Sequence, residues 1–168
     1  MPRIIFHIDV NSAFLSWSAV KLVMAGKPDI RLVPSIVSGD PNDRRSIITA
    51  ASIPAKKLGI KTAQPVSMAL RTCPTLVLVR GDWEWYKRCS EGFIAICCSY
   101  SPVLQQFSID ECFIDMSLCC TPENAVAMAL RLKDQVKRLL QLPRKLSRGI
   151  RHTVSIGQRF LTGRIASR

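Results

Sequence analysis

The sequence has few of the residues that most often bind zinc, because it contains only two histidines and no Cys-x-x-Cys motif. Its seven cysteines include two adjacent pairs, Cys97–Cys98 and Cys119–Cys120, and the others are scattered. This arrangement disfavours a disulfide framework and predicts reduced thiols that pack as small apolar side chains. The sequence also lacks an apolar run near the roughly 20 residues that span a bilayer, and Asp9 brings a charge too early in the chain for the apolar region of a secretory signal. We therefore expect a cytoplasmic protein with no membrane partner.

Acidic residues are absent after Asp134, whereas nine lysines and arginines lie beyond it. The preceding residues carry 15 bases and 12 acids, so most of the net charge of +12 belongs to the end of the chain. A basic segment favours a polyanionic partner, with nucleic acid as the first candidate. The alternative is a solvated tail that makes no specific contact.

Apolar periodicity and turn residues predict a mixture of strands and helices. Strands are expected at about residues 3–10, 32–37, 46–51, 76–79 and 153–156, with two more around a bend within 103–116. Helices are expected at about residues 14–24, 53–58, 65–72, 83–100 and 122–139. Without the small elements of residues 13–78, the order resembles a split βαββαβ sheet with helices on one face, which is a ferredoxin-like arrangement. The predicted fold class is therefore α+β.

Three acidic residues occur within strongly apolar segments. Asp9 follows the mostly apolar residues 4–8, and Asp110 and Glu111 lie within residues 107–114. An acid in such surroundings needs a partner, since an unpaired buried charge is costly, and neither segment supplies an obvious base. A divalent cation is the economical partner, and Mg²⁺ prefers oxygen ligands of this kind. Two such ions about 4 Å apart would activate an attacking oxygen and stabilise a leaving one.

This interpretation sets a geometric condition. Neighbouring residues of a regular strand point to opposite faces, so Asp110 and Glu111 can share a site only at a bend or a hairpin turn. The alternative is that these acids are edge-strand or turn residues that water solvates.

Several motifs resemble those of the Y-family translesion DNA polymerases of the UmuC and DinB type. Residues 8–14, Ile-Asp-Val-Asn-Ser-Ala-Phe, resemble the first acidic motif, and residues 108–111, Ser-Ile-Asp-Glu, match the second motif letter for letter. Between them, residues 47–74 resemble the fingers segment, and Asp-Trp-Glu-Trp-Tyr at 82–86 is similar to the UmuC-like branch. The resemblance covers roughly residues 2–135.

The resemblance implies that Asp9, Asp110 and Glu111 hold two Mg²⁺ ions, with the carbonyl oxygen of Val10 as a further ligand. The ions would orient a primer 3′ hydroxyl and an incoming deoxynucleoside triphosphate for phosphoryl transfer. Phe14 occupies the place of the steric gate, where a ring abuts the sugar and clashes with a ribose 2′-hydroxyl. The alternative for Phe14 is a core aromatic residue on an amphipathic helix.

The residues implied to bind the nucleotide depart from the family pattern. Ala13, beside the gate, replaces an aromatic residue, and Asn11 replaces the second acid of the first motif. In the fingers, Ile53 and Lys56 stand where the family commonly has the Tyr and Arg that grip the triphosphate. Lys56 can still meet a phosphate as a point charge, but it lacks the bidentate fork of arginine. Ile53 cannot donate a hydrogen bond.

The resemblance divides the chain into a palm at residues 1–12 and 79–157, fingers at 13–78 and a basic tail at 158–168. After residues 153–157 the family continues into a helix, a thumb and a little-finger domain that grips DNA, and these parts are absent from this sequence. A truncated gene, a degraded copy or a deliberately shortened chain would all have this form.

The predicted function is Mg²⁺-dependent, template-directed nucleotidyl transfer by the catalytic core of a translesion DNA polymerase. Its implied partners are primer–template DNA, deoxynucleoside triphosphates and a sliding clamp that the missing C-terminal regions would contact. Two alternatives stay open. The chain could be a non-catalytic remnant that at most binds nucleic acid, or a two-metal nuclease, although neither His7 nor His152 is well placed in the sequence as its general base.

Overall fold

The computed structural model describes residues 3–40, 43, 45–139 and 154–158. The described residues form two compact units, one from residues 3–11, 89–139 and 154–158, and the other from residues 12–88. Helix α4 (Trp83–Cys98) contributes to both, because the boundary falls after Arg88.

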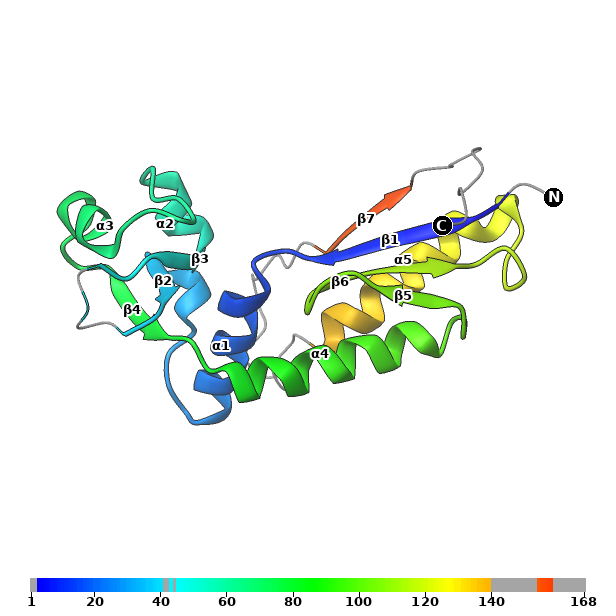
Figure 1. Ribbon diagram of the computed structural model, residues 1–168, viewed down its shortest axis with the longest axis horizontal. Helices are drawn as coiled ribbons and strands as arrows, with labels where there is room; N and C mark the ends of the chain where they lie inside the picture. Colours follow the sequence, from blue (N-terminus) through cyan, green and yellow to red (C-terminus); the bar gives the residue numbers. More distant parts are fainter. Residues whose placement is uncertain (1–2, 41–42, 44, 140–153, 159–168) are drawn as a thin grey trace. The chain divides into compact units, whose positions relative to one another are not determined.

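The first unit contains a four-stranded sheet in the order β5–β6–β1–β7, in which every neighbouring pair is antiparallel. Its elements are β1 (Ile5–Val10), the second part of α4, β5 (Leu104–Gln106), β6 (Glu111–Asp115), α5 (Pro122–Leu139) and β7 (Val154–Gln158). Their order along the chain and in the sheet is the split βαββαβ, ferredoxin-like arrangement (Figure 1). The predicted α+β fold class is therefore confirmed.

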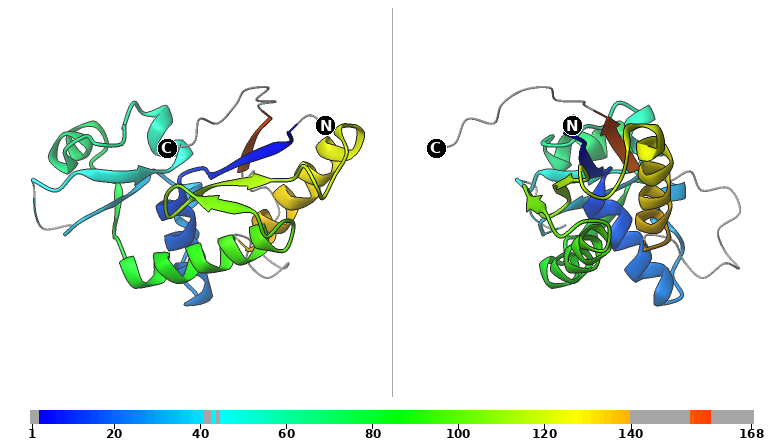
Figure 2. Two further views of the ribbon diagram at one scale, coloured as in Figure 1. Left: turned by 45° about the vertical axis from the view of Figure 1, so that its right-hand side comes forward. Right: turned by 90° about the vertical axis from the view of Figure 1, so that its right-hand side faces the viewer.

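One face of this sheet is buried and the other is partly open. Alternate residues of β1 and β6 are buried, and the residues between them are half-exposed. Helices α4 and α5 lie on the same side of the sheet (Figure 2). The buried apolar residues of this unit include Phe6, Ile8, Val10, Phe93, Cys97, Cys112, Ile114, Ala125, Ala129, Leu132 and Val136. Burial of each larger side chain stabilises the fold by roughly 1.5–3 kcal/mol, so this core fixes which face of β1 stays open.

The second unit has a three-stranded sheet in the order β3–β2–β4, in which β2 is antiparallel to β3 and parallel to β4. Its elements are α1 (Ala13–Met24), β2 (Ser35–Ser38), β3 (Ile48–Ala51), α2 (Ile53–Lys57), α3 (Val66–Thr72), β4 (Val77–Arg80) and the first part of α4. One apolar cluster joins the sheet to α2 and α3: Ile36, Ile48, Ala51, Ala55, Ile60, Val66, Ala69, Cys73 and Leu76.

Local capping residues set several of the helix boundaries. The Ser52 hydroxyl accepts a hydrogen bond from the amide of Ala55 at 3.2 Å and caps α2. The Asp82 carboxylate accepts one from the amide of Trp85 at 3.0 Å and caps α4. Gly26, just after α1, has a φ of 74°, which glycine adopts without strain.

The strand predicted at residues 32–37 is wrong in its first half. Ile30–Leu32 form a 3₁₀ helix (η1), and β2 starts only at Ser35. The Asp29 carboxylate accepts a hydrogen bond from the Arg31 amide at 2.9 Å, which favours the tight turn over an extended chain. The apolar residues of this turn resemble a strand in sequence but are placed by a local cap.

The longest helix of the described residues, α5, has 18 residues and carries charged side chains along its length. Across the described ranges, no helix combines the length and the apolar character that crossing a bilayer requires.

Candidate functional site

Asp9 and Glu111 are cross-strand neighbours. Asp9 is the last residue but one of β1, and in the antiparallel pairing with β6 it stands directly opposite Glu111, the first residue of that strand. Residues that are directly opposite project from the same face, and both are half-exposed on the open face of the sheet. The amide of Val10 donates a hydrogen bond to the carbonyl oxygen of Asp110 at 3.0 Å. The structure thus brings positions 9, 110 and 111 together.

A bend before β6 allows Asp110 and Glu111 to lie at one place. The amides of Phe107 and Ser108 both donate to the carbonyl oxygen of Glu111, at 3.0 and 3.1 Å, and close the hairpin turn between β5 and β6. The Ser108 hydroxyl donates to Oδ1 of Asp110 at 2.7 Å. From α4, the Ser90 hydroxyl donates to the Ile109 carbonyl at 2.5 Å. Helix and turn together therefore fix the backbone and the side chain of Asp110.

The electrostatics of Asp9 show that the three acids act on one another. Burial raises the pKa of Asp9 above its ordinary value, and the carboxylates of Asp110 and Glu111 raise it further, whereas His7 lowers it. Mutual repulsion of this kind is relieved by a cation, and carboxylate oxygens are the ligands that Mg²⁺ prefers. The residues present therefore fit a divalent cation in charge and in donor chemistry.

The side chains are not drawn together as they would be around a bound ion. Within the described part of the chain, no three His, Cys, Asp or Glu side chains are gathered closely enough to enclose a metal. Glu111 instead contacts His7, with 2.5 Å between its Oε1 and the ring Nε2.

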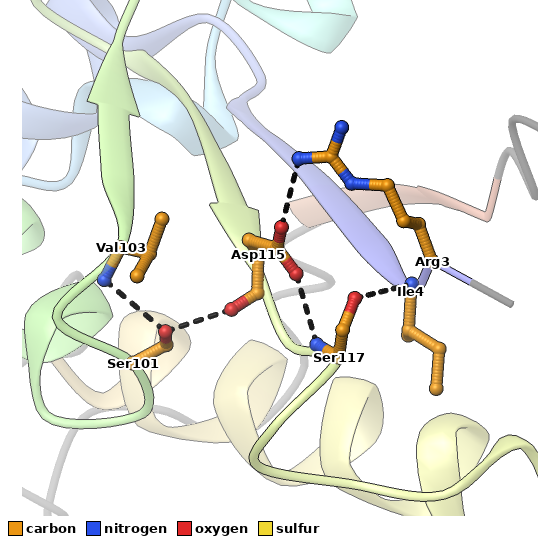
Figure 3. Close-up of polar contacts among 6 residues, drawn as sticks. All are labelled: Arg3, Ile4, Ser101, Val103, Asp115 and Ser117. Carbon is orange, nitrogen blue, oxygen red and sulfur yellow. Dashed lines mark hydrogen bonds and ion pairs between the residues drawn. The ribbon is translucent and has the colours of Figure 1, made fainter. Parts of the chain in front are cut away.

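Asp115, on the same open face, has a different role. Arg3 donates to its Oδ2 and the amide of Ser117 donates to its Oδ1, each at 3.0 Å, and its backbone carbonyl accepts from Ser101 at 2.7 Å (Figure 3). The Ser117 hydroxyl also accepts from the amide of Ile4 at 3.0 Å. These contacts tie the end of β6 to the start of β1, so Asp115 is a structural acid with its own base.

The residues implied to bind a nucleotide lie in the second unit. Phe14 is half-buried on α1, and its ring packs on that of Tyr86, with 4.9 Å between the ring centroids. Lys56, on α2, donates from Nζ to the hydroxyl of Ser12 at 2.9 Å, and Ser12 has a left-handed φ of 51°. Ala13 is the buried first residue of α1. The structure is compatible with Phe14 as a steric gate and as a core aromatic residue, because its ring contacts other aromatic rings without being fully buried.

Sequence reasoning missed two residues that contact the acids. His7 was considered only as a general base, although it lies two positions before Asp9 and therefore on the same face of β1. Ser108 belongs to the second acidic motif but has no role in the sequence prediction, although serine two residues before an aspartate commonly forms a local side-chain turn. In both cases the signal in the sequence is a separation of two residues, His7 from Asp9 and Ser108 from Asp110.

Comparisons with known proteins add an independent line of evidence. The family described as impB/mucB/samB matches residues 8–167. A DNA polymerase IV of Clostridium acetobutylicum is 38% identical over 141 residues, which cover 83% of this chain and 36% of that protein. DNA polymerase IV 2 of Methanosarcina mazei is 33% identical over 168 residues, which cover 98% of this chain and 42% of that protein. The chain thus spans well under half the length of these curated relatives.

Solved structures have the same fold. DinB from Sulfolobus solfataricus has a TM-score of 0.72 at 20% identity, with 92% of this chain and 41% of that chain covered. An insertion ternary complex of Dbh DNA polymerase gives the same TM-score and identity, with 92% and 42% covered. At this level of identity the similarity establishes the architecture.

Proposed function

We propose that this chain, which belongs to the impB/mucB/samB family, supplies the cation-binding and nucleotide-binding part of a translesion DNA polymerase. The resemblance predicted from the acidic motifs is confirmed by the family match over residues 8–167. The proposed reaction joins a deoxynucleoside monophosphate from its triphosphate to the 3′ end of a primer on a DNA template. The relatives named DNA polymerase IV support this reaction class.

The observation that carries the proposal is the pairing of Asp9 with Glu111 across β1 and β6, with Asp110 at the adjoining bend. Two residues a hundred positions apart in the sequence are neighbours in the sheet, and their charges raise each other's energy. The geometric condition set by the sequence, a bend at Asp110 and Glu111, is met by the hairpin turn.

Asp9, Asp110, Glu111 and the carbonyl oxygen of Val10 are the residues that would hold two Mg²⁺ ions. When bound, such ions neutralise the charge of the triphosphate and orient the attacking and leaving oxygens. The chain's own residues supply the positioning: Asp9 and Glu111 project from paired strands, and Ser108 holds the Asp110 carboxylate. Groups on paired strands are placed more rigidly than groups on loops.

The nucleotide-binding role belongs in this proposal to Ala13, Phe14 and Lys56. The half-buried ring of Phe14 would lie against the sugar and exclude a 2′-hydroxyl. The ammonium of Lys56 would exchange its hydrogen bond with Ser12 for a phosphate oxygen, which attracts it as a point charge. In this proposal the palm comprises residues 1–12 and 79–157, and the fingers comprise residues 13–78.

Primer extension tests the proposal. The protein is incubated with a primed template, Mg²⁺ and deoxynucleoside triphosphates, in parallel with Asp110→Asn and with Glu91→Gln. The second variant is a matched control, because Glu91 is an exposed acid on α4. We expect template-directed extension that Asp110→Asn reduces at least about a hundredfold, since it removes one charge of a metal cluster, and that Glu91→Gln leaves unchanged.

Three results would contradict the proposal. Salt-dependent DNA binding without any extension would indicate a non-catalytic nucleic-acid-binding chain. Shortened primers would indicate a nuclease that uses the same acids. Extension that persists in Asp110→Asn would place the reaction elsewhere in the chain.

A further inference from the structure

We infer that His7 is a positioning residue that holds the Glu111 carboxylate in the orientation required to bind a divalent cation. This inference rests on the proposed function, because it gives Glu111 a ligand role. His7 lies outside the two acidic motifs, residues 8–14 and 108–111, that carry the family resemblance.

The contact is a diagonal one across two strands. His7 is paired with Phe113, and Glu111 is paired with Asp9, so the histidine and the glutamate are next-but-one neighbours on the open face. The distance between Nε2 of His7 and Oε1 of Glu111 is 2.5 Å. A carboxylate oxygen accepts hydrogen bonds, so we assign His7 the tautomer with a proton on Nε2, which donates a hydrogen bond to Oε1.

An aromatic stack fixes the histidine ring. The rings of His7 and Phe113 are stacked, with 4.5 Å between their centroids and 12° between their planes. Phe107 packs edge-on against Phe113, with 6.2 Å between the two ring centroids. The imidazole therefore has a defined plane, and its Nε2 is aimed at the carboxylate by the packing of Phe113 beneath it.

The consequence concerns the second carboxylate oxygen. With Oε1 held by His7, Oε2 of Glu111 remains the oxygen for a cation, and the side chain is restrained against the repulsion of the other two acids. Carboxylates that bind metals are commonly held by such hydrogen bonds, and loss of the outer partner typically weakens metal binding by about 10–100-fold. His7 would thus act on the cation through Glu111, without touching the cation or the substrate itself.

Two substitutions separate the donor from the ring. His7→Phe keeps an aromatic ring to stack on Phe113 but removes the donor. His7→Gln keeps an N–H near the position of Nε2 but removes the ring. Mn²⁺ takes the oxygen ligands that Mg²⁺ takes, and the concentration of the free ion can be followed by electron paramagnetic resonance. Binding is measured on the whole chain without DNA or nucleotide, beside Asp110→Asn and Glu91→Gln.

We expect His7→Phe to weaken Mn²⁺ binding by about tenfold or more, and His7→Gln to restore most of that loss. Unchanged affinity in His7→Phe, beside a folded protein and a clear loss in Asp110→Asn, would overturn the inference while leaving the proposed function intact. Equal losses in His7→Phe and His7→Gln would assign the effect to the ring and also overturn it. No Mn²⁺ binding by the unsubstituted chain would remove both the inference and the metal site on which it rests.

A measurement without metal tests the contact itself. The chain has only two histidines, so their ¹⁵N resonances can be assigned by comparison with a His152→Gln variant. We expect His7 to be in the tautomer protonated at Nε2 where the ring is neutral, and to become a mixture of tautomers in Glu111→Ala. A tautomer protonated at Nδ1 in the unsubstituted chain would overturn the inference, whatever the affinity for Mn²⁺.

Discussion

Asp9 and Glu111 face each other across β1 and β6, and each is placed there by a strand whose other face is packed into the core. The carboxylates that would attract a cation also repel each other, and this repulsion lowers the stability of the folded chain. Burial raises the pKa of Asp9 most, and the charges of Asp110 and Glu111 raise it further.

The Asp9→Asn variant is expected to be more stable than the unsubstituted chain in the absence of metal at neutral pH. The folded-state pKa of Asp9 lies above the ordinary value near 3.9, so folding disfavours the ionised form. Stability is therefore lost as the pH rises through the interval between the two values, and the gain from asparagine appears over that interval and vanishes below it. Because solvent screens this half-exposed group, the melting temperature should rise by only about 1–3 °C.

Thermal unfolding in a chelating buffer, repeated with Mg²⁺, measures this effect. Mg²⁺ should raise the melting temperature of the unsubstituted chain and leave that of Asp9→Asn nearly unchanged. A less stable Asp9→Asn, or equal stabilisation of both proteins by Mg²⁺, would show that the three acids do not form a shared cation site.

Ser108→Ala is expected to loosen the turn that holds Asp110. The substitution removes the 2.7 Å hydrogen bond to Oδ1, a contact of a kind worth about 1 kcal/mol. We expect Mn²⁺ binding and primer extension to fall by roughly 5–10-fold, the factor that corresponds to this energy. Ser99→Ala is the control, because the Ser99 hydroxyl makes a similar bond, to the Ile96 carbonyl at 2.7 Å, at the end of α4. Equal effects of the two variants would assign them to general stability.

Asp115→Asn is expected to change stability with pH and to leave extension unchanged. The Ser117 hydroxyl, its amide and Arg3 together hold the pKa of Asp115 below its usual range. Its ionised form therefore stabilises the fold above about pH 4, and this contribution is lost as the pH falls through the lowered value. At neutral pH the loss should reach at most about 1 kcal/mol, as for a solvent-screened ion pair. Chemical denaturation at pH 7 and at pH 3 measures it, and equal losses at both would contradict the assignment.

Phe14→Ala is expected to relax the choice of sugar. Removal of the ring would open the space beside the 2′ position, and the ratio of ribonucleotide to deoxynucleotide incorporation should rise by about tenfold or more. Tyr86→Phe is the matched control, because it keeps the ring packed on Phe14 and removes only the hydroxyl that contacts Ser18 at 2.6 Å. An unchanged ratio in Phe14→Ala would make Phe14 a core residue of α1.

Lys56→Ala is expected to raise the KM for the nucleotide by roughly tenfold with little change in kcat, if its ammonium contributes a phosphate contact of about 1.4 kcal/mol in ground and transition states alike. Lys57→Ala is the neighbouring control, since Lys57 is an exposed lysine of the same helix. Steady-state kinetics with varied nucleotide concentration compares the two variants. Equal effects would show that Lys56 contributes only to the general surface charge.

The local parts of the fold could be predicted from the sequence because short-range chemistry determines them. Ser52 and Asp82 begin helices through their own side chains, and β1 is apparent from its apolar residues. The start of β2 could not be placed, because a cap at Asp29 competes with the extended chain. The sequence shows that a bend is required at Asp110, but one of the hydrogen bonds that fix this bend comes from Ser90, which is distant in the sequence.

The candidate site shows the same division. The three acids were identified from motifs, whereas the contact between His7 and Glu111 depends on the register of β1 against β6. Register is a long-range property that side-chain packing decides, so no local pattern in either strand states it. The family resemblance supplied the proximity of the acids but contained no information on the histidine.

The alternation along β1 makes the six residues from Ile5 to Val10 unusually intolerant of changes in length. One residue inserted between His7 and Asp9 would turn either Asp9 inward or buried residues such as Phe6 outward, because a shift of one position exchanges the two faces of a strand. Substitutions can damage the charged side and the packed side separately. An insertion or deletion disturbs both faces at once. We therefore expect sequence variation in this strand to consist of substitutions and not of changes in length.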